Sequence, residues 1–110
     1  MNKNKKDIME KIFKLADLID YQKGAVVSHT IINKKAGTVT LFSFDRGQGL
    51  SEHVAPFDAL VYIVSGKAKV FIAGKPHCLS KGEFIIMPAN KPHSLKAIEK
   101  FRMLLVMVKK

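Results

Sequence analysis

The chain has 110 residues, of which 47% are apolar, so it can form the hydrophobic core of one domain but is too short for two. Cys78 is the only cysteine, which excludes an internal disulfide and is typical of proteins kept in a reducing compartment. The sequence shows no membrane-spanning run and no signal-peptide pattern, and we therefore expect a cytoplasmic protein.

The net charge of +10 is the feature that most suggests a nucleic-acid or other anionic partner. The lysines, however, are scattered from Lys3 to Lys110 rather than clustered. Arginine, which reads phosphate and guanine better than lysine, occurs only as Arg46 and Arg102, and no recognition-helix or RNA-binding motif is visible. A solvated lysine-rich surface explains the charge better, and a nucleic-acid partner ranks last among the hypotheses.

The first element in chain order is a predicted short helix. Apolar side chains recur at spacings of three and four residues, which places them on one helical face: Ile8, Ile12, Leu15 and Ile19. Acidic residues near the start of this segment suit the positive end of a helix dipole. We predict a helical arm over residues 1–22, with the helix itself at 5–19 and its apolar face packed on the barrel or on a neighbouring subunit.

From Gly24 onward the apolar pattern has a period of two, which is typical of β-strands. The segments TVTLFSF at 38–44 and KAKVFI at 67–72 are examples. Turn signals rich in glycine, proline and asparagine recur at intervals of about ten residues: 35–37, 47–49, 65–66, 73–76, 81–82 and 88–90. This spacing predicts an all-β domain over residues 23–110, built of short antiparallel strands in a sandwich or barrel.

Two motifs within this region are more specific than the strand pattern. In GQGLSEHVAPFDALVYIVSG, residues 47–66, five residues separate Gly47 from His53, and the segment closes on Gly66. In GEFIIMPANKPHSL, residues 82–95, five residues separate the first glycine from Pro88, and His93 follows five positions later. A segment of hairpin length, residues 67–81, lies between the two motifs.

Together these motifs resemble the pair that marks the cupin family, and the resemblance extends over about residues 24–108. It implies a cupin-type antiparallel β-barrel, also described as a double-stranded β-helix or jelly roll, with the histidines of both motifs pointing into the lumen. Asn90 stands where the second motif usually has glycine, and asparagine is the next most tolerant residue of a left-handed backbone.

The sequence departs from the family at the metal ligands. Metal-binding cupins usually hold a divalent metal with three histidines and a glutamate. Here Ala55 stands at the second histidine and Ala59 at the glutamate, so only His53 and His93 remain as candidate ligands. Because two imidazoles alone make a weak site, we predict that a divalent transition metal is weakly bound or absent.

Other side chains could in principle replace the two missing metal ligands. Asp58 and Glu52 are next to motif positions, and a bulge could turn either one inward. We interpret Asp58 as an acceptor for turn amides, and His29 and His77 as surface or rim residues. Cys78 is expected to pack as a small apolar residue. Three methionines at strand positions are interpreted as core or lumen lining: Met87, Met103 and Met107.

Two hypotheses for the function follow. In the first, the protein binds a small molecule in the barrel lumen, which Val61 and Ile63 line and the two alanines widen, while the two motif histidines orient a polar group. The alternative is a metal-dependent cupin enzyme of the oxygenase or isomerase type with a reduced ligand set. We expect a homodimer, as is common among small cupins, with the apolar segment 101–108 and the arm supplying the twofold contact.

Overall fold

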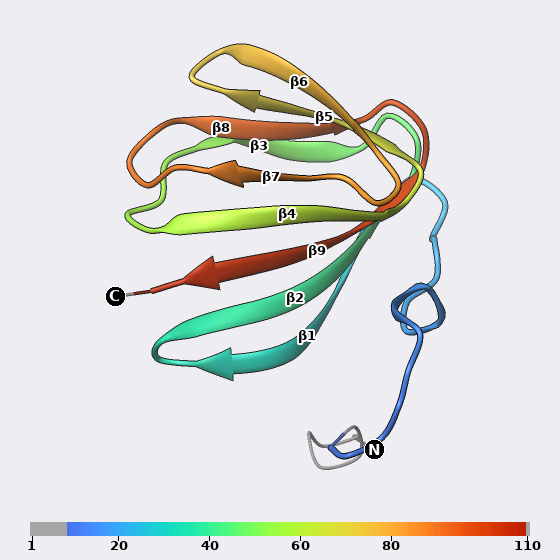
Figure 1. Cartoon of the computed structure of the whole chain (residues 1–110). Coiled ribbons are helices and arrows are strands. Elements are labelled where there is room, and N and C mark those ends of the chain that lie inside the picture. Colours follow the sequence, from blue (N-terminus) through green and yellow to red (C-terminus); the bar gives the residue numbers. More distant parts are fainter. Residues whose placement is uncertain (1–8, 110) are drawn as a thin grey trace.

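The computed structural model describes residues 9–109, which form two antiparallel β-sheets stacked face to face (Figure 1). The larger sheet has the strand order β1 (Val26–Lys34), β2 (Gly37–Phe44), β9 (Phe101–Val108), β4 (Asp58–Ser65) and β7 (Phe84–Met87). The smaller has the order β3 (Gly49–His53), β8 (His93–Ala97), β5 (Lys67–Ile72) and β6 (Lys75–Ser80). This confirms the predicted all-β, jelly-roll barrel.

The turns between strands follow the chemistry of their residues. Asn90 has a φ of 65°, and its N–H donates to the carbonyl oxygen of Ala55 at 2.7 Å, which ties the loops of the two motifs together. Gly66 has a φ of 84°, and a Cβ built there would lie 2.7 Å from the Cα of Phe101. Only glycine satisfies both the left-handed backbone and this close approach.

The core lies between the sheets and is filled unevenly along the barrel. At one end, the rings of Phe44 and Phe101 stack with their centroids 4.4 Å apart, and both are fully buried. Along β9 and β4 toward the other end, the inward side chains become smaller on β4, from Ile63 through Val61 to Ala59. The aromatic end is therefore closed by packing, and Ala59 leaves space at the opposite end.

The predicted helix at 5–19 is wrong for the residues that the structure describes, and residues 5–8 lie outside them. The only helical segment in residues 9–109 is a 3-10 turn, η2 (Leu15–Asp17). Ile12 is fully exposed, whereas Ile19 is buried, and Arg102 donates to the carbonyl oxygen of Ile19 at 2.9 Å. Because a helix this short is marginal in water, these contacts to the sheet decide the conformation instead.

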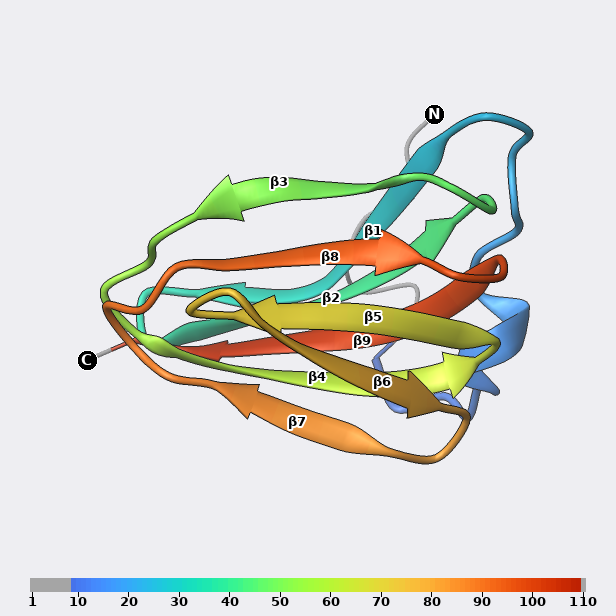
Figure 2. The same cartoon turned by 90° about the horizontal axis from the view of Figure 1, so that it is seen from above.

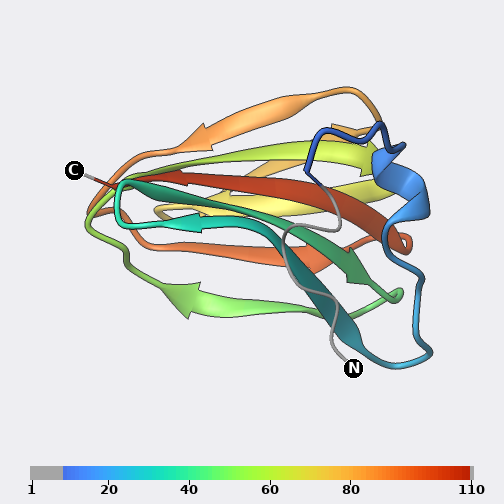
Figure 3. The ribbon, with the colours of Figure 1, turned by 90° about the horizontal axis from the view of Figure 1, so that it is seen from below.

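The segment after η2 passes the end of the larger sheet, opposite the C-terminus, before it enters β1 (Figure 3). No helix among residues 9–109 is long and apolar enough to cross a membrane.

Candidate functional site

The histidines of the two motifs lie directly opposite each other on neighbouring strands. His53 ends β3 and His93 begins β8, and the two are paired in the sheet register after an irregularity that begins at Leu50. Their Nε2 atoms are 3.1 Å apart, and the ring planes meet at 74°. The structure therefore brings together two side chains that are 40 residues apart in the chain.

A small cavity lies beside this pair inside the barrel. It has a volume of about 40 Å³. All the side chains that line it are apolar except those of the two histidines. The lining residues are Leu50, His53, Ala55, Ala59, Met87, His93, Leu95, Met103, Leu105 and Met107. A buried water needs roughly 10–15 Å³ on the same measure, so the cavity has room for a guest of only a few heavy atoms.

Four of the six residues predicted to form the lumen line this cavity: both histidines, Ala55 and Ala59. Val61 and Ile63 do not, because they lie further toward the closed aromatic end and are fully buried in the core. Sequence reasoning missed Leu50, Leu95 and Leu105. Leu50 and Leu95 are paired across β3 and β8, a relation that becomes visible only once the register is known.

The outer nitrogen of each ring faces a backbone carbonyl, and this determines where the ring protons are. His53 Nδ1 lies 2.8 Å from the carbonyl oxygen of Ser51, and His93 Nδ1 lies 3.2 Å from that of Lys91. Since a carbonyl oxygen can only accept, both Nδ1 atoms carry the proton and donate it. In the neutral rings, each Nε2 therefore has a free lone pair, and the two Nε2 atoms lie 3.1 Å apart with the rings edge to face.

The two imidazoles differ in their surroundings. His93 is 3% exposed, whereas His53 lies at the exposed end of β3. Burial lowers the pKa of His93 below its ordinary value of 6.5, and the nearby His53 lowers it further, against a smaller opposing effect from the bond to Lys91. The buried ring is therefore kept neutral near pH 7, with its Nε2 lone pair available to a ligand.

The usual cupin ligand set of three histidines and a glutamate does not fit this site. The methyl groups of Ala55 and Ala59 offer no donor atoms, and no group of three or more His, Cys, Asp or Glu side chains converges anywhere in residues 9–109. Asp58 is not a substitute, because its Oδ1 accepts from the N–H of Ala89 at 2.8 Å, as the sequence interpretation expected. Glu52 and His29 are exposed.

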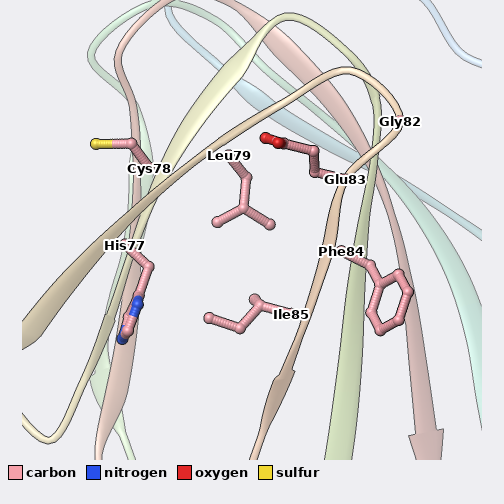
Figure 4. Close-up of a pocket in the computed structure, with 7 residues that line it drawn as sticks. All are labelled: His77, Cys78, Leu79, Gly82, Glu83, Phe84 and Ile85. Carbon is pink, nitrogen blue, oxygen red and sulfur yellow. The ribbon is translucent and has the colours of Figure 1, made fainter.

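His77 lines a different, open groove of about 470 Å³ between β6 and β7, the strands that end the two sheets at the same edge of the stack (Figures 2 and 4). Leu79 and Ile85 occupy the space between these strands, while the sulfur of Cys78 points away from it (Figure 4). Cys78 is exposed, so the prediction that it packs as an apolar residue is wrong. Strand alternation buries Leu79, and its neighbour Cys78 consequently faces solvent on this edge strand.

The family model described as "Cupin domain" matches residues 40–109, and the chain therefore belongs to the cupin family. A search of the curated proteins found no match.

Solved structures agree with this assignment. A conserved protein of unknown function from Streptococcus pyogenes is 37% identical, with 92% of this chain and 89% of that chain covered and a TM-score of 0.88. A cupin 2 conserved barrel domain protein from Leptotrichia buccalis is 42% identical over 88% of this chain, with a TM-score of 0.86. This chain spans about half (47%) of that protein. A cupin superfamily protein from Desulfitobacterium hafniense is 27% identical, with 92% of this chain and 93% of that chain covered and a TM-score of 0.87.

Proposed function

We propose that this cupin domain binds a compact ligand in the barrel lumen, with the Nε2 atoms of His53 and His93 as its polar contacts. The observation that carries the proposal is the approach of the two Nε2 atoms to 3.1 Å on the wall of a cavity whose other lining side chains are apolar. Apolar walls with a few converging polar atoms are what a small-ligand site requires.

The lone pairs also restrict the chemistry of the ligand. Two acceptor nitrogens this close repel each other unless a proton or a positive charge is shared between them. A ligand that suits this site therefore presents an O–H or N–H proton, or a positive charge, to both rings. A ligand that offers only acceptor atoms is disfavoured.

The size of the cavity limits the ligand as well. About 40 Å³ is far below the roughly 300–1,000 Å³ of sites for drug-sized molecules, so the ligand has only a few heavy atoms. Larger ligands require the lining methionines to change rotamer, which their unbranched side chains permit more readily than leucine does.

The experiment is a titration of labelled protein, followed through the ring nitrogens of the histidines by NMR. The probes are acetamide, urea and imidazolium as compact proton donors, and Zn²⁺ and Ni²⁺ as ions. At least one probe is expected to shift Nε2 of His53 and His93 together, while His29 and His77, which lie outside the cavity, serve as internal controls. If no probe moves the two lumen rings apart from the controls, the proposal fails.

A metal-dependent enzyme of the oxygenase or isomerase type is the second candidate, because two Nε2 atoms 3.1 Å apart are close enough to ligate one ion. The missing third and fourth ligands count against it, so purified protein is expected to carry substoichiometric divalent metal, and added Zn²⁺ or Ni²⁺ to stabilise it only modestly. Metal analysis decides the matter. A stoichiometric divalent metal, lost in both His53→Ala and His93→Ala, would favour the enzyme.

A further inference from the structure

We propose that the ligand of the lumen is a soft monovalent metal ion, Cu(I), held by Nε2 of His53 and His93 and by the methionine thioethers beside Ala59. The inference rests on the proposed lumen site and names its ligand class.

The first argument is the orientation of the two rings. Each Nδ1–H donates to a backbone carbonyl, that of Ser51 or that of Lys91. This is the arrangement that holds metal-binding histidines in place, since it sets the tautomer and leaves Nε2 free to ligate. The Nε2 atoms are 3.1 Å apart, which is within the span that two nitrogen ligands of one cation occupy, and a modest rotation of the exposed His53 ring would direct both lone pairs at it.

The second argument is what surrounds the position of the missing glutamate. In the sheet register, Ala59 of β4 is paired with Met87 on one side and with Met107 on the other. Directly paired residues point to the same face, with their Cβ atoms about 4.5–5.5 Å apart. Two thioethers therefore flank the position where the family places a carboxylate, and both line the same cavity as the two histidines.

Of the four methionines in residues 9–109, three line this cavity of about 40 Å³. The third is Met103, which is fully buried and lies nearer the aromatic end. Thioether sulfur is a soft ligand that suits Cu(I), whereas Zn²⁺ and harder ions prefer thiolate, imidazole or carboxylate. The lumen therefore favours Cu(I) over Zn²⁺ because of the kind of donor atoms it offers and not because of their number.

The charge balance also favours a monovalent ion. The cavity is lined by neutral side chains only, and the nearby Asp58 is exposed and does not line it. The cost of placing an ion in apolar surroundings rises with the square of its charge, so an uncompensated divalent ion is far more costly here than a monovalent one. The small volume also suits an ion without its hydration shell.

The test uses the full chain with Cys78→Ser, because the exposed thiol of Cys78 binds Cu(I) by itself. Cu(I) is supplied without oxygen from its bicinchoninate complex, and Ag(I) serves as the redox-stable probe for NMR of the methionine methyl groups. We expect one Cu(I) per chain, and methyl shifts for Met87 or Met107 on addition of Ag(I). Met9, which is 64% exposed, is the internal control and should not shift.

Separate variants test the contributions of the methionines and of the histidines to metal binding. The double variant Met87→Leu/Met107→Leu keeps the cavity apolar and filled, and should weaken Cu(I) binding at least about tenfold while leaving Zn²⁺ binding unchanged. Met9→Leu is the matched control, with unchanged Cu(I) affinity. His53→Ala removes an exposed ligand with little risk to folding and should weaken the binding of both ions.

The outcomes distinguish this inference from the proposed function. Unchanged Cu(I) affinity in the double methionine variant, or Zn²⁺ bound more tightly than Cu(I), would overturn the inference and leave the lumen site standing. If the rings of His53 and His93 respond to neither ion nor to the organic probes, the inference and the proposed function fall together.

Discussion

The two motif histidines are close in space but unequal in burial. His93 is almost fully enclosed, and its Nδ1 is held by the Lys91 carbonyl, whereas His53 closes the lumen from the exposed end of β3. The buried ring is thus the fixed partner, and the exposed ring is the one that a ligand from solvent meets first.

This difference makes a prediction about pH for the metal-free protein. The pKa of His93 is lowered in the folded state, so the unfolded chain binds more protons as pH falls below about 6.5. The free energy of unfolding should therefore be highest above that value and should decrease as pH drops through the folded pKa. Urea denaturation at several pH values between 8 and 5 measures this change in the free energy of unfolding.

The control for this prediction is His93→Gln, which should reduce the pH dependence in that interval. An equally steep pH dependence in this variant would contradict the assignment to His93. Asp45 does not interfere, because the N–H of Gly24, followed by that of Arg46, lowers its pKa below the ordinary 3.8, outside the measured interval.

Gly66 allows a second prediction at the scale of single residues. Gly66→Ala should destabilise the protein by about 2 kcal/mol or more, because it combines a left-handed backbone with a contact of 2.7 Å to Phe101 Cα. Gly47 has nearly the same φ, 85°, but nothing lies within 4 Å of its added Cβ, so Gly47→Ala should cost only about 1–2 kcal/mol. If urea denaturation shows that both variants lose the same free energy of unfolding, the close approach at Gly66 has no energetic effect.

Among the elements, the segment before β1 is held by side chains of the larger sheet. Ser43 is fully buried, and its Oγ donates to the carbonyl oxygen of Asp20 at 2.9 Å. Tyr21 stacks against the guanidinium of Arg102, 4.3 Å from its ring centroid, and shares a hydrogen bond of 3.0 Å with Ser65. The contacts that anchor this segment are therefore concentrated at residues 19–21.

Two truncated proteins should show that residues 19–21 carry most of the stabilising contacts of this segment. Deleting residues 1–21 should cost about 3 kcal/mol, because it exposes the contact area of Ile19 and leaves Ser43 without its partner. The melting temperature should fall by about 10 °C or more. Deleting residues 1–13, which include the fully exposed Ile12, should change it little. Identical melting temperatures for the two truncated proteins would contradict the anchoring role.

At the scale of the whole molecule, the outer face of the larger sheet is notably apolar. One row of paired residues crosses all five strands: Ile32, Val39, Val106, Leu60 and Ile86. A neighbouring row adds Leu104, Tyr62 and Phe84, while its fourth member, Leu41, is fully buried and adds no surface. Phe84 is 60% exposed and Ile86 is 45% exposed. Contiguous apolar surface of this kind is typical of subunit interfaces.

We therefore expect the homodimer to form through this face. Light scattering at micromolar concentration should give a mass near twice 12.3 kDa. The double variant Phe84→Lys/Ile86→Lys should be monomeric, since it places four lysines at each twofold contact. Val54→Lys is the control, because Val54 is 59% exposed but lies between β3 and β4, away from this face. A wild-type mass near 12.3 kDa would refute the dimer.

The sequence by itself determined those features that depend on a few neighbouring residues. The turn residues Gly66 and Asn90 need left-handed backbones, and the structure has them there. Asp58 bonds a turn amide as expected. The motif spacing also indicated the barrel and the pair His53 and His93, because it places both residues at defined positions on strands that the structure pairs.

Only the tertiary structure decided which distant residues meet. Segment 38–44 is apolar on both faces, so alternation could not show that Phe42 and Phe44 face the core between the sheets while Leu41 is buried on the opposite face of its sheet. The helical spacing at 5–19 was overruled by contacts to Ser43 and Arg102, which follow much later in the chain. The two methionines beside Ala59 come from β7 and β9, and register between strands, which sequence alone does not specify, places them there.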